Sequence, residues 1–168
     1  KNWLSITTDG YYVYATDGVN VYRFLRTDTA IGSAWNDVNV DLLTWIRGKG
    51  RLMAALNTGA TRSVYNITAG SIAGTPALPT DIAPSIIGPD FTWVGFAGGA
   101  SCIYAAGYQG DKSLVFRWGI KADGTGLDAA VPALVDGLPD GEIVKSIRDY
   151  QGFIQIGTDQ GVRFCTSD

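Results

Sequence analysis

The stretch FIQIGTDQGVRFC, Phe153–Cys165, decides the fold of this chain. Two runs in which apolar and polar residues alternate flank a short polar segment with Asp and Gly, which is typical of a β-hairpin. Nearly the same pattern occurs near the N-terminus as YVYATDGVNVYRF, Tyr12–Phe24. Because the same hairpin pattern occurs near both ends, the chain is predicted to be a repeat protein built from β-sheets.

Two further copies lie between these ends. The four copies align on a small residue that closes the second apolar run, at intervals of 40 to 51 residues: Ala15, Ala55, Ala106 and Gly157. A first strand is expected before each, with Ile6, Ile46, Val94 and Ile147 at equivalent positions. The third strands are expected in VYRFL, SVYNI, LVFRW and VRFC.

Segments rich in Pro separate the copies. TPALPTDIAPS (75–85) resembles VPALVDGLPDG (131–141), and each is expected to hold a short outer fourth strand and a connection, because Pro is tolerated at sheet edges. Four strands in a period of about 40 to 50 residues indicate a β-propeller, in which stacked blades bury each other's faces. Small residues such as Ala15 are expected where the inner strands crowd near the axis.

The predicted fold class is therefore all-β. We expect a β-propeller or propeller segment with about four blades of three to four antiparallel strands each. Residues 1–168 are expected to form a single propeller domain or segment, part of a longer chain, with blades at approximately 1–40, 41–89, 90–141 and 142–168. A closed ring of four blades is the alternative architecture.

The composition excludes several functions. A net charge of −3 gives no basic excess, so neither nucleic acid nor an anionic membrane is an expected partner. The chain has no His, which removes the usual general base and the commonest metal ligand, and no cofactor or metal is expected. No apolar run is long enough for a membrane span. Cys102 and Cys165 lie in apolar runs and are predicted to be free, buried cysteines, although their spacing does not forbid a disulfide.

Acidic residues offer little catalytic promise. Most Asp residues lie in turns, where their side chains are expected to cap the backbone: Asp17, Asp28, Asp37, Asp123, Asp128, Asp136, Asp140 and Asp159. DGTGLD (123–128) could offer oxygens to Ca²⁺, but an ordinary turn is the favoured interpretation. Glu142 is the only Glu, and no pair of carboxylates is marked for glycoside hydrolysis, so the chain is not expected to be an enzyme.

Two aromatic residues are candidates for ligand contact. Trp35 and Tyr108 fall in turn or connection contexts beside Asn, Asp or Gln, an arrangement that suits stacking on a sugar ring. They are the candidate glycan-contact residues, and the alternative for both is a partly buried loop aromatic. The other Trp residues fall in predicted strands and are expected to pack between blades.

The last copy resembles a widespread propeller repeat. Its core, Ile156–Phe164, has the form apolar–Gly–Thr–x–x–Gly–Val–x–apolar, and YATDGVNVYRF is a looser copy. Similar repeats occur in the periplasmic sensor propellers of two-component regulators and in minor tail proteins of bacteriophages. The units here vary in length, and the two middle hairpins lack the Thr-x-x-Gly-Val core, so the chain departs from the sensor pattern.

The resemblance implies a non-catalytic structural or adhesion module of a phage tail, located in the virion. Its expected partners are other tail proteins, additional copies of itself or a glycan of the host surface. The alternative is an extracytoplasmic or secreted bacterial propeller that senses a ligand or binds glycan. A propeller glycoside hydrolase is the more distant alternative.

Overall fold

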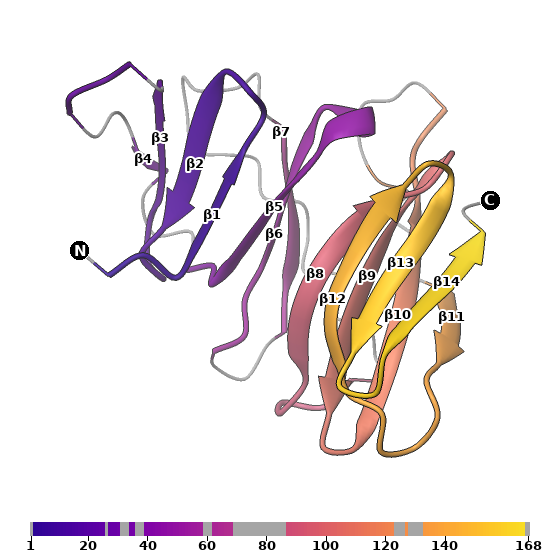
Figure 1. Cartoon of the computed structure of the whole chain (residues 1–168). Coiled ribbons are helices and arrows are strands. Elements are labelled where there is room, and N and C mark those ends of the chain that lie inside the picture. The colour runs from indigo at the N-terminus through magenta and orange to yellow at the C-terminus, as the bar shows by residue number, and fades with distance from the viewer. Residues whose placement is uncertain are drawn as a thin grey trace. The chain divides into compact units, whose positions relative to one another are not determined.

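A computed structural model describes residues 2–25, 27–30, 34–35, 39–58, 62–68, 87–122, 127 and 133–166. The chain divides into two compact units, Lys1–Asp81 and Ile82–Asp168 (Figure 1). Each unit contains two antiparallel sheets of three or four strands in its described residues. No helix in the described part is long and apolar enough to cross a membrane. The all-β prediction is confirmed.

The first unit contains a four-stranded and a three-stranded sheet. The four-stranded sheet consists of β1 (Ser5–Thr8), β2 (Tyr12–Thr16), β3 (Val21–Leu25) and β4 (Ala34–Trp35), in that order. The three-stranded sheet consists of β5 (Leu42–Ile46), β6 (Arg51–Ala55) and β7 (Val64–Thr68), with a single 3₁₀ turn, η1 (Arg47–Lys49), after β5.

First strands join these two sheets. The hydroxyl of Ser5 accepts a hydrogen bond from the Leu43 amide at 3.0 Å, and that of Thr7 accepts one from the Trp45 amide at 3.0 Å. Side chains of β1 therefore satisfy amides of β5 that β6, the partner strand of β5, leaves unpaired. Behind this contact a buried cluster contains Tyr14 and Leu52, and the rings of Tyr14 and Trp45 stack 6.0 Å apart.

The second unit repeats the arrangement. Its four-stranded sheet contains β8 (Thr92–Gly98), β9 (Cys102–Gln109), β10 (Lys112–Gly119) and β11 (Ala133–Gly137). Its three-stranded sheet contains β12 (Val144–Tyr150), β13 (Phe153–Thr158) and β14 (Val162–Thr166). β11 confirms the expected fourth strand in 131–141, whereas 75–85 lies outside the described residues.

First strands also meet in the second unit, where β12 packs against β8. A Cβ at Gly95 would lie 3.2 Å from Cγ2 of Ile147, so the absence of a side chain there permits this close approach. Ile147, Ile154 and Ile156 are buried in the cluster between the two sheets. Phe91, Trp93, Phe116 and Trp118 form an aromatic cluster in the β8–β11 sheet and its lead-in, with edge-to-face contacts and one tilted contact, Trp93–Trp118.

A buried hydroxyl pins the segment that leads into the next sheet in both units. Thr16 donates to the carbonyl of Val40 at 2.6 Å, two residues before β5. Ser113 donates to the carbonyl of Glu142 at 2.8 Å, two residues before β12. Because both hydroxyls are almost wholly buried, these bonds fix where each following sheet begins.

The strand register corrects the predicted alignment. Ala15 pairs with Ile6, but Ala55 pairs with Leu42, and Ile46 lies beside the hairpin turn opposite Arg51. The expected equivalence of Ile6 and Ile46 is wrong because the hairpins differ in length. The four aligned small residues lie in the second strand of each sheet, while the contacts between sheets of one unit come mainly from first strands.

The sheets lie within the ranges 1–40, 41–89, 90–141 and 142–168, and the blade boundaries themselves stay predictions. The prediction that both cysteines are buried is wrong for one of them. Cys102 and Cys165 are both free thiols, and Cys102 is buried. Cys165 lies on the same face as Ile154 but is exposed because β14 ends its three-stranded sheet and all five of its residues are exposed.

Candidate functional site

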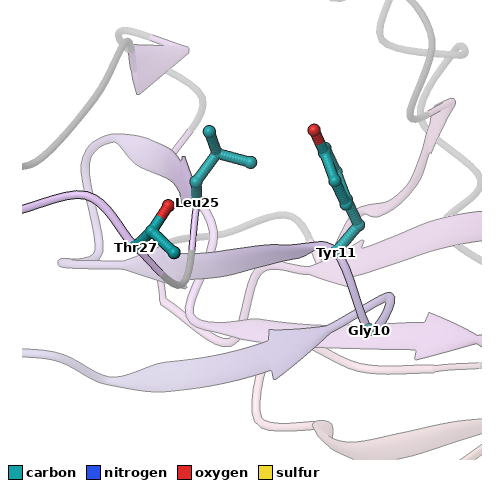
Figure 2. A pocket seen from close by; sticks show the side chains of 4 residues that line it. All are labelled: Gly10, Tyr11, Leu25 and Thr27. Atoms are coloured by element: carbon teal, nitrogen blue, oxygen red, sulfur yellow. The ribbon is translucent and has the colours of Figure 1, made fainter.

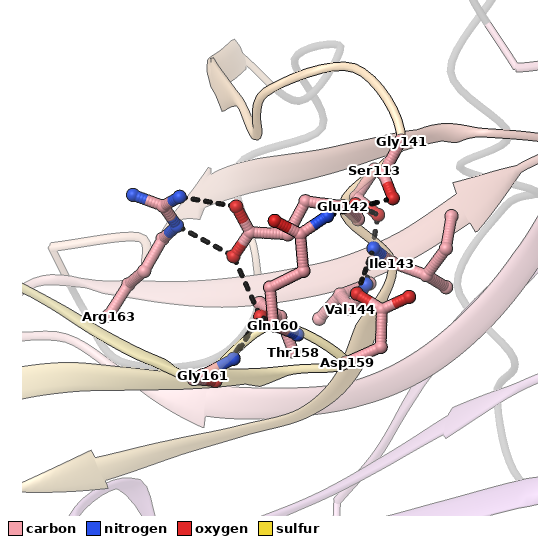
Figure 3. Close-up of polar contacts among 10 residues, drawn as sticks. All are labelled: Ser113, Gly141, Glu142, Ile143, Val144, Thr158, Asp159, Gln160, Gly161 and Arg163. Atoms are coloured by element: carbon pink, nitrogen blue, oxygen red, sulfur yellow. Dashed lines mark hydrogen bonds and ion pairs between the residues drawn. The ribbon is translucent and has the colours of Figure 1, made fainter.

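The lead-in to β12 carries a polar network centred on Glu142 (Figure 3). Only 2% of Glu142 is exposed. Its carboxylate accepts hydrogen bonds from both Nε and Nη2 of Arg163 on β14, with the Nε–Oε1 distance at 2.8 Å. The hydroxyl of Thr158 donates to the same carboxylate at 2.7 Å. The network therefore ties the lead-in to the outer strand of its own sheet.

Two further contacts fix the backbone of this lead-in (Figure 3). The amide of Ile143 donates to Oδ1 of Asp159 at 2.9 Å, and the amide of Val144 donates to the Ser113 hydroxyl at 2.9 Å. Both ends of the short segment are thus held by neighbouring strands. These contacts hold the lead-in to β12 against the strands around it.

The electrostatics of Glu142 favour a permanently ionised carboxylate. The hydrogen bonds from Arg163 and Thr158 lower the pKa of Glu142 from 4.5 to about 2, although burial opposes the shift. Hydrogen bonding to Glu142 raises the pKa of Arg163 in turn. A general acid in glycoside hydrolysis needs a raised carboxyl pKa, which this environment does not provide.

The predicted capping by turn carboxylates is confirmed for Asp17 and Asp28, whereas Asp136 lies in β11 and Asp159 accepts from the amide of Ile143, outside its own turn. Asp17 Oδ1 accepts from the amides of Val19 and Asn20, at 3.2 and 2.8 Å, and Asp28 accepts from Leu25 at 2.8 Å. The predicted turn residues Asp37, Asp123 and Asp128, with the segment 123–126, lie outside the described residues.

Asp9 is a turn carboxylate that the sequence interpretation missed. It accepts hydrogen bonds from the amides of Tyr11 and Tyr12 and from the hydroxyl of Tyr14, at 2.6 to 2.9 Å. Partial burial alone would raise the pKa of Asp9, but these bonds together lower it. Burial and the bond to Asp9 raise the pKa of Tyr14. This clamp fixes the first hairpin tip.

The two candidate glycan residues lie in different units. Trp35 ends the short strand β4, is only 5% exposed, and stacks on Tyr14 at 6.3 Å. The predicted turn or connection context is wrong for both residues, because both lie in strands, and the aromatic core of the first unit buries Trp35. Tyr108 lies in β9 and is half-buried, with Nζ of Lys145 5.8 Å from its ring centre. Glycan contact by either residue stays a prediction.

An open pocket lies at the tip of the first hairpin (Figure 2). It has a volume of about 360 Å³ and is lined by Gly10, Tyr11, Leu25 and Thr27. The Tyr11 ring is highly exposed and rests edge-on against Tyr12, at 4.7 Å between ring centres. An exposed ring beside an aliphatic side chain provides a small stacking platform.

The β12–β14 sheet has one buried and one exposed face. The strand register places Tyr150, Phe153, Val162 and Phe164 on the same face, which lies opposite Ile154 and Ile156. These four large apolar side chains are 46 to 63% exposed, and we call them the β14 face. The register also places Arg148 and Gln155 on this face. Large exposed apolar side chains on one side of a sheet often mark an interaction site.

The β1–β4 sheet also has an uncovered apolar face. Ser5, Thr7 and Tyr14 point toward β5, so the alternating residues Leu4 and Ile6 point away from it. Leu4 and Ile6 are 57 and 63% exposed, and Trp3 packs edge-on against Tyr22 beside them. Val13 and Phe24 are half-buried on the same side of the sheet, and Ala15 and Tyr22 there are buried. We call the set Trp3, Leu4, Ile6, Val13 and Phe24 the β1 face.

Sequence reasoning missed both faces. Alternation predicts that one side of a strand is apolar, but Phe164 and Ile6 have the same pattern as buried strand residues elsewhere. Tyr11 was missed for the same reason, because nothing in the sequence distinguishes it from the adjacent Tyr12. Only the partner of each sheet distinguishes an exposed face from a core face. The Glu142–Arg163 pair had one usable signal, because a lone Glu in an apolar, weakly charged chain needs a cation.

No protein-family model matches this chain, and no curated protein is similar to it at a significant level. Solved structures resemble it in fold. The β-propeller domain of Cps50 (Swd1) from Myceliophteria thermophila is 13% identical, with a TM-score of 0.63 over 96% of this chain and 50% of its own length. The AfRom2 CNH domain is 12% identical, with a TM-score of 0.53 over 95% of this chain and 50% of its own.

At these identities the likeness concerns the fold alone. This chain spans about half the length of each of the two solved chains. Its antiparallel sheets of three to four strands and this likeness together make the fold that of a β-propeller.

Proposed function

We propose that the chain is a non-catalytic structural or adhesion module of a phage tail, working in virion assembly or in recognition of the host surface. The observation that carries the proposal is the β14 face, where Tyr150, Phe153, Val162 and Phe164 are together exposed on one side of a sheet. A protein that works through its surfaces needs such a patch, whereas an enzyme needs convergent polar groups. The resemblance of Ile156–Phe164 to tail-protein repeats supplies the phage context.

The Glu142 network supports a non-catalytic role. The one Glu of the chain is engaged by Arg163 and Thr158, and its carboxylate stays ionised over the whole physiological range. Glu142 is therefore suited to holding strands together, and it is poorly suited to the proton donation that a glycoside hydrolase requires.

Particle composition tests the tail proposal. Phage particles produced by the organism that encodes the chain are purified, and their proteins are identified by mass spectrometry, with immunogold labelling of the tail. We expect peptides of this chain in particles and label on the tail. A chain found in membrane or secreted fractions and absent from particles would overturn the tail assignment.

The pocket at Tyr11 favours a second candidate, an extracytoplasmic propeller that binds a ligand such as a glycan. Tyr11 lines one side of this open pocket, and Leu25 and Thr27 line the other side (Figure 2). A glycan array with the wild type and Tyr11→Ala, Trp35→Ala and Tyr108→Ala tests this. Loss of binding only with Tyr11→Ala assigns the site to the pocket, whereas no binding by the wild type contradicts this candidate.

A further inference from the structure

Asp is followed directly by Gly at several places in this chain. In such a pair the backbone nitrogen of Gly can attack the side-chain carboxyl carbon of Asp, because Gly has no side chain to hinder the approach. The pairs begin at Asp9, Asp17, Asp123, Asp136 and Asp140, and the pair at Asp123 lies outside the described residues. The described pairs differ in what the Gly amide is bonded to.

In the pairs at Asp9, Asp17 and Asp140, the Gly amide donates to a residue other than the preceding Asp. The amides of Gly10 and Gly18 donate to threonine hydroxyls two residues earlier, at 3.0 and 3.1 Å. The amide of Gly141 donates to a backbone carbonyl, that of Asp111, at 2.9 Å. Each of these bonds directs the amide hydrogen away from the carboxylate of the preceding Asp.

The carboxylates of the first two pairs are occupied as well. Asp9 accepts from two amides of its own turn at 2.6 and 2.7 Å, and Asp17 accepts from two amides at 2.8 and 3.2 Å. Attack by the Gly nitrogen in these turns therefore requires that several hydrogen bonds break first.

The pair Asp136–Gly137 in β11 has a different geometry. The Gly137 amide donates to Oδ1 of Asp136, the residue immediately before it, at 2.8 Å. The carboxyl carbon of Asp136 is one bond from this oxygen, so the nitrogen and the carbon that it would attack are already close together. Holding two reacting groups in this way favours ring closure, because little motion remains to be restricted.

The β10–β11 pairing leaves this amide available. Leu138 donates to the carbonyl of Ser113 at 3.1 Å, so the alternation of an antiparallel pair turns the preceding Gly137 amide away from β10. In the described part of the chain β11 is the last strand of its sheet, and all five of its residues are exposed. The nitrogen, the carboxyl group and solvent water therefore meet at an open sheet edge.

We propose that Asp136 is a site of covalent modification, at which Asp136–Gly137 closes to a succinimide and reopens as isoaspartate. The Gly137 nitrogen forms a bond to Cγ of Asp136, and one carboxyl oxygen leaves as water with the amide proton and the carboxyl proton. Water then adds to one of the two ring carbonyls. Addition at the side-chain carbonyl restores Asp, whereas addition at the main-chain carbonyl leaves the chain running through Cγ.

The conversion lengthens the main chain of β11 by one methylene group. Gly137 pairs with Leu114 of β10, and Leu138 packs against the buried cluster between the two sheets of the second unit. Because both contacts follow directly after Asp136, isoaspartate at this position should shift the pairing of Gly137 and loosen the packing of Leu138.

Peptide mapping of chain 1–168, aged at neutral pH and physiological temperature, tests the proposal. Electron-based fragmentation distinguishes Asp from isoaspartate at each position, and methyl transfer by an isoaspartyl methyltransferase measures the total. We expect isoaspartate to accumulate at Asp136 about tenfold or more faster than at Asp9, Asp17 or Asp140, because each of the other Gly amides must first lose a hydrogen bond.

Two controls separate the effect of the structure from that of the sequence. In denaturant the same pairs should isomerise at similar rates, since the hydrogen bonds that distinguish them are gone. Gly137→Ala should slow the reaction at Asp136 by about tenfold or more, because the added methyl group crowds the attacking nitrogen. This variant should fold, because a Cβ at Gly137 would lie 3.8 Å from its nearest neighbours, and circular dichroism verifies that it does.

A smaller ratio between Asp136 and the other pairs in the folded chain, or the same ratio in denaturant, would overturn the proposal. Both comparisons use the wild type, so they stand even if Gly137→Ala does not fold. An unchanged rate at Asp136 in folded Gly137→Ala would also overturn it, because the Gly137 nitrogen would then not be the attacking atom.

Discussion

The hairpins β2–β3 and β13–β14 share one turn design and differ in how the Asp is used. In the first, Thr16 accepts from the Gly18 amide and Asp17 caps the amides of its own turn. In the last, Thr158 accepts from the amides of Gln160 and Gly161 at 3.1 Å, as Thr16 does in its turn. Asp159 instead accepts from Ile143, in the lead-in to β12. Asp17 thus closes its own turn, whereas Asp159 holds the lead-in to β12.

The surroundings of the two hairpins differ more than their turns. Val21 of β3 is fully buried, and β4 pairs with the outer edge of β3. Val162 of β14 is 55% exposed, and no strand in the described part pairs with the outer edge of β14. The repeat therefore encodes the hairpin, while the neighbouring sheets determine which hairpin is buried.

The largest expected effect separates Val21 from Val162. Val21→Ala should lower the free energy of unfolding by about 2 kcal/mol, because it removes buried methyl groups and leaves a cavity. Val162→Ala should change it by less than about 0.5 kcal/mol, as expected at an exposed position. Urea denaturation measures both. Equal losses of unfolding free energy in the two variants would contradict the claim that Val21 is core and Val162 is surface.

The next effect separates the two threonines. Thr16→Val should cost about 1–2 kcal/mol, because it leaves the buried Val40 carbonyl without its donor. Thr158→Val should cost less than half of that, since Arg163 still satisfies the Glu142 carboxylate. Denaturant melts of the two variants under identical conditions decide the order, and a larger loss for Thr158→Val would contradict the account.

Acid sharpens the comparison at the last hairpin. Because the folded-state pKa of Glu142 lies below its ordinary value, its contribution to stability is present above pH 4.5 and is lost as pH falls toward 2. Glu142→Gln should therefore lower the melting temperature at pH 7 and lose this deficit as the pH falls toward 2. The effect is modest because Arg163 is half exposed.

Thermal melts across this pH range, with Lys112→Gln as a surface control, measure the trend. A deficit that is unchanged at pH 2 would show that the pair does not carry the acid dependence.

The smallest effect concerns the aligned small residues of the two hairpins. An Ala at Gly157 would place its Cβ 2.5 Å from the Ser146 hydroxyl, which is exposed and free to rotate away. Gly157→Ala should therefore change stability by about 0.5 kcal/mol or less, matching Ala15 at the equivalent position of the first hairpin. A loss above about 1 kcal/mol would mean that the backbone there cannot move apart.

The hairpins, their order and the β11 strand could be predicted from the sequence, because alternation and Asp/Gly turns are local signals. The register of Ile46 could not be predicted, because it depends on hairpin length. The burial of Trp35 and the exposure of Cys165 could not be predicted either. Trp35 has the polar neighbours of a loop residue but packs on Tyr14, and Cys165 has the apolar neighbours of a core residue but lies on an uncovered strand.

The exposed residues of the candidate sites could likewise not be predicted from their neighbours in the sequence. The sequence selected Trp35 and Tyr108 by their neighbours in the chain, whereas the exposed surfaces involve Tyr11, Ile6 and Phe164. Whether these side chains are exposed depends on packing between sheets that are distant in sequence. Glu142 was noted from the sequence only as the single Glu, and its bonds to Arg163 and Thr158 depend on strands that come later in the chain.

Hydrogen–deuterium exchange of the two third strands, followed by mass spectrometry, tests the central claim most directly. We predict that the amides of Val21 and Tyr22 exchange slowly, because β4 pairs with this part of β3 and the core covers it. The amides of β14 that point away from β13 should exchange rapidly, because no strand in the described part pairs with that edge. Equal protection of the two segments would contradict the claim that neighbouring sheets determine which hairpin is buried.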